Sequence, residues 1–308
     1  MNKIAYIFPG QGSQYIGMGK DFYDNFQESR KVFEEASSIL GLDMKELIFK
    51  QNDRINITEF TQICLATTCI AQARIVKKLG ILPDVCAGLS LGEYPALMTA
   101  GVMSFEEGIS LVQKRGTYMD STLPKGISTM AAVIGLTGEE VLEVCNDTKG
   151  LVTIANYNYP GQVVISGENI AVEKASDKLM EIGARRIAPL NVSGAFHSPL
   201  LKAAGEKLLE ELAIVSIKDP LIPYESNVTG QFVYDKSNIK ELLSKQVYSS
   251  VKWQQSVENM IKEGVGTFIE IGPGKTLSKF VKKINSNCKV LNIDKVDDLD
   301  KLQEVIYA

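Results

Sequence analysis

Histidine is almost absent from this chain of 308 residues, which has only His197, and cysteine is scarce, with five residues. The cysteines are odd in number, none stands in a Cys-x-x-Cys pair, and most lie in apolar runs. This usage favours reduced thiols in a reducing compartment over a disulfide framework. A zinc site needs several cysteine or histidine ligands at short spacing, so we expect no bound metal.

The chain also lacks a strong excess of either charge and any long apolar run near its start. The 33 basic and 37 acidic residues give a net charge of −4, which offers no overall attraction for nucleic acid or for an anionic membrane. The apolar run at residues 4–8 stops at Pro9 and Gly10, too soon for a signal peptide or a membrane span. We therefore expect a cytoplasmic protein that binds neither nucleic acid nor membrane.

Short apolar runs predict the strands of a large sheet. Each run is followed by glycine, proline or aspartate and then by a helical pattern, which is typical of a mostly parallel α/β sheet. A helix that is apolar on nearly all sides is predicted over 62–78, and Ser104 and Glu107 have the spacing of a capping box that opens a helix to residue 119. The predicted strands are residues 4–8, 85–87, 267–271 and 290–293.

The middle of the chain has a different order of elements, β-α-β-β-α-β, which is that of a ferredoxin-like unit. Thr137 and Glu140 form a second capping box at the start of its first helix. Because parallel-strand candidates lie on both sides, we predict a small domain at 126–194 inserted into a large α/β domain made of 1–125 and 195–308. Its predicted strands are 130–134, 151–155, 162–166 and 185–190, its helices end near 146 and 182, and residues 156–161 connect the middle strands.

Ser90 lies between two glycines in Gly88-Leu89-Ser90-Leu91-Gly92. This fits G-x-S-x-G, in which a serine sits on a sharp strand-to-helix turn and acts as a nucleophile. The alternative is that Ser90 is a helix N-cap, a common position for serine. The pattern alone leaves both interpretations open.

A serine nucleophile needs a base, and histidine is the usual one because its pKa lies near working pH. His197, 107 positions after Ser90, is the only histidine in the chain. If a histidine activates Ser90, it is therefore His197. The alternative is a hydrogen-bonded, partly buried histidine with a structural role.

The loop at residues 8–14 follows the first predicted strand and contains a proline and two glycines. Ligands of α/β sheets bind at the carboxyl ends of the strands, where this loop lies. The backbone N–H groups of Gln11 and of Leu91, the residue after the serine, can therefore form an oxyanion hole. The alternative is an ordinary strand-to-helix loop.

Five motifs carry a resemblance to a known family, and they occur in one order between residues 8 and 277: FPGQGSQ, GLSLGEY, LVQKRGTYM, VSGAFHSPL and FIEIGPGKTL. Together they resemble the acyltransferase family, and in particular its stand-alone malonyl-CoA:acyl carrier protein transacylases of type II fatty acid synthesis. The resemblance implies an α/β-hydrolase-like core with an inserted ferredoxin-like subdomain. That architecture agrees with the division drawn from the pattern of elements.

The resemblance also implies roles for individual residues. Ser90 matches the family nucleophile, His197 its base, and the main-chain carbonyl of Gln246 the group that orients the imidazole. Arg115 matches the arginine that binds the free carboxylate of the malonyl group, although the pattern alone favours a solvated arginine on a helix face. Leu89 stands where many members have histidine, so any polar role at that position is absent here.

The implied reaction is a ping-pong transfer of malonyl from malonyl-CoA, through a malonyl-serine ester, to the phosphopantetheine thiol of holo acyl carrier protein. It needs no permanently bound cofactor, and we expect a monomer. Candidates for docking the acidic carrier are basic residues of two segments, whose alternative is a solvated basic face: Arg185, Arg186, Lys282 and Lys283. Alternative functions are a serine thioesterase or esterase, and a trans-acting acyltransferase of a polyketide synthase.

Overall fold

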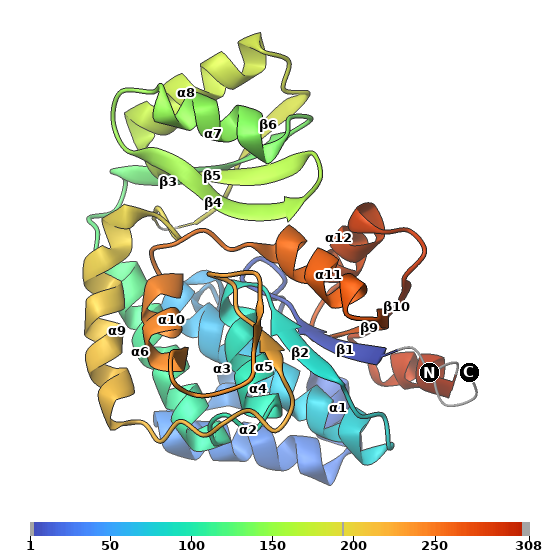
Figure 1. Cartoon of the computed structure of the whole chain (residues 1–308). Coiled ribbons are helices and arrows are strands. Elements are labelled where there is room, and N and C mark those ends of the chain that lie inside the picture. The colour runs from blue at the N-terminus through green and yellow to red at the C-terminus, as the bar shows by residue number, and fades with distance from the viewer. Residues whose placement is uncertain (1–2, 193, 304–308) are drawn as a thin grey trace.

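A six-stranded sheet forms the centre of the larger part of the molecule in the computed structural model, which describes residues 3–192 and 194–303 (Figure 1). Side chains alternate between the two faces of the sheet along the first strand. Tyr6 and Phe8 belong to the core on one face, and Ala5 and Ile7 belong to the core on the other face. The order is β10-β9-β1-β2-β7-β8, and only the last pair is antiparallel. The strands are β1 (Lys3–Phe8), β2 (Val85–Gly88), β7 (Tyr224–Glu225), β8 (Phe232–Val233), β9 (Val265–Ile271) and β10 (Lys289–Ile293).

Helices cover both faces of this sheet. Helix α4 is buried on nearly all sides, as its composition predicts, because α2 and α6 pack against it. No helix in the described part of the chain is both long and apolar enough to cross a membrane. The helices of this part are α1 (Lys20–Asn25), α2 (Gln27–Leu40), α3 (Met44–Phe49), α4 (Thr58–Lys78), α5 (Glu93–Thr99), α6 (Phe105–Ser121), α9 (Lys202–Ile214), α10 (Ile239–Gln246), α11 (Trp253–Lys262) and α12 (Thr276–Ile284), with 3-10 turns η1 (Arg54–Asn56), η2 (Ser90–Gly92), η3 (Pro199–Leu201) and η4 (Val296–Leu302).

A separate four-stranded antiparallel sheet lies beside the large part, with its two helices on the outer face (Figure 1). Its order, β4-β5-β3-β6, and the chain order β-α-β-β-α-β are those of a ferredoxin-like unit. The predicted α/β fold class is thereby confirmed. The division into domains at 126 and 194 stays a prediction. The elements are β3 (Ser128–Ile134), α7 (Gly138–Asn146), β4 (Val152–Tyr159), β5 (Gln162–Glu168), α8 (Asn169–Glu181) and β6 (Arg186–Pro189).

The segment 156–161 differs from the prediction. Strand β4 continues to Tyr159, and only Pro160 and Gly161 turn. Asparagine is rare in strands, so the pattern gave no sign of this extension. The extension is held by pairing with β5 and by the large part, because the Tyr157 N–H donates to Val251 O at 2.9 Å. The two parts of the molecule are therefore joined by main-chain hydrogen bonds.

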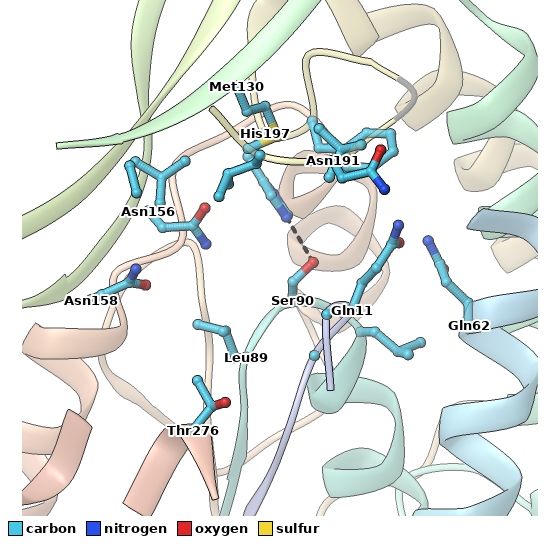
Figure 2. Close-up of a pocket in the computed structure, with 18 of the residues that line it drawn as sticks. Gln11, Gln62, Leu89, Ser90, Met130, Asn156, Asn158, Asn191, His197 and Thr276 are labelled. Atoms are coloured by element: carbon cyan, nitrogen blue, oxygen red, sulfur yellow. Dashed lines mark hydrogen bonds between the residues drawn. The ribbon is translucent and has the colours of Figure 1, made fainter. Parts of the chain in front are cut away.

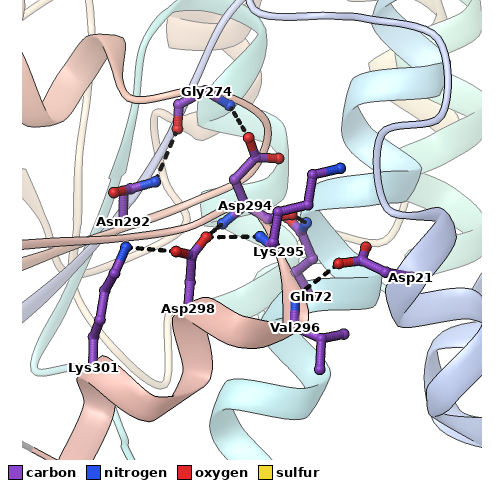
Figure 3. A network of polar contacts seen from close by, with 9 residues as sticks. All are labelled: Asp21, Gln72, Gly274, Asn292, Asp294, Lys295, Val296, Asp298 and Lys301. Carbon is purple, nitrogen blue, oxygen red and sulfur yellow. Dashed lines mark hydrogen bonds and ion pairs between the residues drawn. The ribbon is translucent and has the colours of Figure 1, made fainter.

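A polar network fixes the loop before α12 (Figure 3). Asp294 accepts from the Gly274 N–H at 3.1 Å, and the buried Gln72 amide of α4 donates to the Asp294 carbonyl at 2.9 Å. Asp298 accepts from the N–H groups of Asp294 and Lys295 at 3.0 and 2.8 Å. These bonds connect the end of β10 to the loop before α12 and to α4.

Candidate active site

A cavity of about 460 Å³ lies between the two sheets. The loop after β1, the turn after β2 and helix α6 form one side of it, and strands β3, β4 and β5 form the other (Figure 2). Its volume is in the range of small-molecule sites. Several side-chain amides line it, among them Gln11, Gln62, Asn156, Asn158 and Asn191.

Ser90 stands on a sharp turn between β2 and α5, with a φ of 52°. The flanking glycines are required by close backbone contacts. A Cβ on Gly88 would lie 2.0 Å from the Gly92 carbonyl oxygen, and one on Gly92 would lie 2.0 Å from the Phe8 carbonyl oxygen. The G-x-S-x-G spacing is thus a steric condition for this turn.

The Ser90 hydroxyl faces His197. The distance from Ser90 Oγ to His197 Nε2 is 2.7 Å (Figure 2), and Arg115 Nη2 donates to the same Oγ at 3.0 Å. No side-chain cap hydrogen bond is made at the start of η2 or of α5. The helix-cap interpretation of Ser90 is therefore wrong.

His197 is held in one orientation by the backbone around Gln246. Its ring Nδ1 lies 2.7 Å from the Gln246 carbonyl oxygen, and the backbone N–H of His197 donates to the Val247 carbonyl at 3.2 Å. Because a carbonyl can only accept, Nδ1 carries the proton and Nε2 presents its lone pair to Ser90. Burial, reinforced by the positive charge of Arg115, lowers the pKa of His197 from 6.5 to about 4, although the bond to Gln246 opposes this shift. The imidazole is therefore neutral at neutral pH, and its Nε2 is free to accept the serine proton.

Arg115 projects from α6 into the interior and is only 1% exposed, so the interpretation as a solvated arginine is wrong. Its Nη1 donates to Gln62 Oε1 at 2.7 Å and its Nη2 to Gln246 Oε1 at 2.9 Å, while burial lowers its pKa. Among the described residues its Nε has no hydrogen-bond partner. A buried guanidinium whose partners are neutral can bind the carboxylate of a ligand strongly.

The expected oxyanion-hole residues lie beside the serine. Gln11 and Leu91 both line the cavity. The loop after β1 approaches the turn so closely that a Cβ on Gly10 would stand 2.6 Å from the Leu89 carbonyl oxygen. The Gln11 side chain also donates to Thr58 Oγ1 at 3.2 Å, which fixes the loop. The role of the two N–H groups stays a prediction.

The expected carrier-docking residues lie outside the cavity. All four side chains are exposed: those of Arg185 and Arg186 at the start of β6, and those of Lys282 and Lys283 in the last turn of α12. Phe280, two residues before Lys282, lines the cavity and contacts the ring of Tyr159 on β4. The α12 lysines are thus close in sequence to the cavity wall.

Sequence reasoning missed the buried polar residues behind Ser90: Glu93, Asn227 and the side chain of Gln246. Burial raises the pKa of Glu93 to about 7. In the sequence Glu93 reads as an ordinary acidic residue of a first helical turn, and Asn227 follows a two-residue strand too short to be recognised. Gln62, on the buried side of α4, was missed as a partner of Arg115. In the described ranges, no cluster of three or more histidine, cysteine, aspartate or glutamate side chains is placed to hold a metal.

A serine hydrogen-bonded to histidine on a strand-to-helix turn, next to a buried arginine, is the arrangement of an enzyme that transfers an acyl group through serine. The family model of the acyl transferase domain matches residues 5–298. The chain belongs to the acyl transferase family.

Several relatives share nearly the whole chain. The malonyl CoA-acyl carrier protein transacylase of Bacillus subtilis (strain 168) is 44% identical over 304 residues, which are 97% of this chain and 96% of that protein. The crystal structure of the transacylase of the same name from Clostridium perfringens has 46% identity and a TM-score of 0.96, and covers 99% of this chain and 97% of its own. A malonyl-transacylase solved in complex with its type II polyketide acyl carrier protein has 36% identity and a TM-score of 0.95, over 98% and 99% of the chains.

The low pKa of His197 predicts the acid limit of Ser90 reactivity. A neutral imidazole is needed to take the serine proton, so the rate should fall by half near pH 4, and not near pH 6.5 where an exposed histidine titrates. The measurement is the rate of Ser90 modification between pH 3.5 and 8, with circular dichroism to identify any acid unfolding. A Gln72→Ala variant is the control, because this buried amide does not line the cavity and the midpoint should stay the same. A midpoint near 6.5 in folded protein would contradict the prediction.

Proposed function

We propose that this protein is an acyl carrier protein S-malonyltransferase, which transfers malonyl from malonyl-CoA to the phosphopantetheine thiol of acyl carrier protein in fatty acid synthesis. The observation that carries the proposal is the buried Arg115 guanidinium, which lies 3.0 Å from Ser90 Oγ. An acyl group bound as an ester on Ser90 has its far end in this neighbourhood. A malonyl group differs from acetyl by a terminal carboxylate, the partner that a guanidinium fork fits.

In the first half-reaction Ser90 Oγ attacks the thioester carbonyl of malonyl-CoA while His197 Nε2 takes the hydroxyl proton. The N–H groups of Gln11 and Leu91 hold the oxyanion. The intermediate then collapses to the malonyl-serine ester, and the departing coenzyme A thiolate takes its proton from His197. The Gln246 carbonyl, which accepts from Nδ1, stabilises the imidazolium between these steps.

In the second half-reaction the thiol of the carrier's phosphopantetheine attacks the ester carbonyl, and His197 Nε2 removes the thiol proton. The bond from the acyl carbon to Ser90 Oγ then breaks, the malonyl group stays on the carrier sulfur, and Ser90 Oγ takes the proton back from His197. Coenzyme A and the carrier bear the same pantetheine arm, so one cavity serves both. Side-chain amides such as those of Asn156, Asn158 and Asn191 line it, and groups of this kind pair with the amides of the arm. No permanently bound cofactor takes part in either step.

We also propose a monomer in the cytoplasm. The five cysteines are buried and unpaired, which suits a reducing compartment. The net charge of −4 gives no overall attraction for nucleic acid. The carrier is a fatty acid carrier in this proposal. A polyketide carrier is the second candidate, favoured by the 36% identity to the transacylase solved with such a partner.

The proposal predicts a covalent intermediate on Ser90. Brief incubation with malonyl-CoA should add one malonyl group to the wild type and none to Ser90→Ala, as measured by intact-protein mass. Holo acyl carrier protein should then remove the group faster than water does. Discharge into water alone would identify a thioesterase, and the absence of any adduct would contradict the proposal. Comparing fatty acid and polyketide carriers in the second step separates the two candidates.

Replacing Arg115 should change the choice of acyl group. Arg115→Ala removes a charge-assisted pairing with the malonyl carboxylate, so kcat/KM for malonyl-CoA should fall roughly 10²-fold or more. The value for acetyl-CoA, which has no carboxylate, should change much less or rise. Damage to Ser90 would lower kcat/KM for both substrates equally, so the ratio of the malonyl-CoA value to the acetyl-CoA value in Arg115→Ala serves as an internal control. Equal losses with both substrates would argue against carboxylate binding by Arg115.

Charge reversal on α12 should weaken carrier binding alone. Lys282→Glu with Lys283→Glu should raise KM for the acidic carrier several-fold, more at low salt, and leave KM for malonyl-CoA unchanged. The matched control is Lys31→Glu with Lys45→Glu, two exposed lysines on α2 and α3. Equal effects of both double variants, or equal effects on both substrates, would remove α12 from the docking surface.

A further inference from the structure

Ser90 has a backbone conformation that needs support from its surroundings. Its φ of 52° lies in the left-handed region, and in the described part of the chain the only other non-glycine residue there is His197, with 57°. Such residues are strained and keep their conformation only when neighbouring contacts hold it. The direction of the Ser90 hydroxyl depends on this backbone.

Asn227 bonds to the backbone on both sides of the turn. Its side-chain Oδ1 accepts from the Ser90 N–H at 2.7 Å, and its Nδ2 donates to the Gly88 carbonyl at 2.7 Å. The side chain is 1% exposed. A single buried amide thus bridges the peptide groups before and after Leu89.

Gln246 holds the other main-chain group of the serine. Its Nε2 donates to the Ser90 carbonyl at 2.8 Å, and its Oε1 accepts from Arg115 at 2.9 Å. Both backbone polar groups of Ser90 are therefore bound by side-chain amides. The same Gln246 side chain connects the serine to the guanidinium.

Glu93 joins the two amide residues. Its Oε2 accepts from Gln246 Nε2 at 2.7 Å and from the Asn227 N–H at 3.3 Å, and its side chain is fully buried. Glu93 lies three positions after Ser90, so the hydrogen bonds through Asn227 and Gln246 start and end on the same turn. None of these three residues lines the cavity, so their side chains act on the reaction only through Ser90 and Arg115.

We propose that Asn227, Glu93 and Gln246 form a positioning clamp, which holds Ser90 in its left-handed conformation and sets the distance between its hydroxyl and Arg115. The clamp is a feature of the site of the proposed function, and it rests on that proposal only for the identity of the acyl group. Because Asn227 neither lines the cavity nor bonds to Arg115, its loss changes the rate of attack by Ser90 and leaves substrate binding in place.

The test compares Asn227→Ala, Asn227→Asp and a control, Gln72→Ala, with the wild type. Gln72 is a fully buried amide that donates to the Asp294 carbonyl (Figure 3), and it does not line the cavity. Asn227→Ala should lower the rate constant for malonylation of Ser90 about 10²-fold, the loss typical of a misplaced reacting group, with KM for malonyl-CoA within about twofold. Asn227→Asp keeps an oxygen to accept from Ser90 and should recover part of the rate.

A second probe separates the clamp from the proposed function. Phenylmethanesulfonyl fluoride forms a bond from sulfur to Ser90 Oγ, releases fluoride, and needs only a reactive serine whose proton passes to His197. Its rate should fall in the same order, wild type, Asn227→Asp, Asn227→Ala, while Gln72→Ala stays with the wild type. If malonyl-CoA gives no adduct but this order holds, the clamp stands and the proposed function fails.

Several outcomes would overturn the clamp. One is an Asn227→Ala rate equal to that of Gln72→Ala with both probes, at a temperature where all variants are folded. Another is a loss confined to KM. Should Asn227→Ala fail to fold, Asn227→Asp decides, with a fall of about tenfold expected and no fall overturning the proposal.

Discussion

The hydrogen bond between Ser90 Oγ and His197 Nε2, 2.7 Å long, is the contact on which the rest of the site depends. It joins residues 107 positions apart, and both have left-handed backbones that cost energy to maintain. Ser90 is placed by the end of β2, and His197 by the segment that leaves the four-stranded sheet. The surrounding glycines, amides and main-chain carbonyls hold these two strained residues within hydrogen-bonding distance of each other.

Burial sets the electrostatics of this pair. The guanidinium of Arg115 is enclosed by neutral partners, and its charge adds to the desolvation that keeps His197 neutral. The buried Glu93, whose pKa burial raises to about 7, offsets part of this charge, and a buried cation without a close carboxylate partner is costly. In the proposed function, a malonyl carboxylate that pairs with Arg115 relieves this cost, and an acyl group without a carboxylate leaves the cost in place.

The sequence predicted features that depend on local chemistry. Apolar runs located the long strands, capping boxes at Ser104 and Thr137 located two helix starts, and the glycines around Ser90 indicated the turn. What escaped prediction depends on contacts between distant segments. Asn227 meets Ser90 across 137 positions, and Gln246 meets Glu93 across 153. The burial of Arg115 could be expected only from the family resemblance. A sequence pattern does not distinguish a solvated arginine on a helix from a buried arginine whose partners lie on other elements.

The four-stranded sheet contributes more than a wall to the cavity. Its last strand leads directly into the segment that carries His197, while β4 pairs with Val251, five residues after the Gln246 carbonyl that orients the same imidazole. The base is thus held from both ends by backbone that the small sheet fixes to the large part. The main-chain bonds that join Val251 to Ala155 and Tyr157 therefore support the segments around His197 as well as the fold.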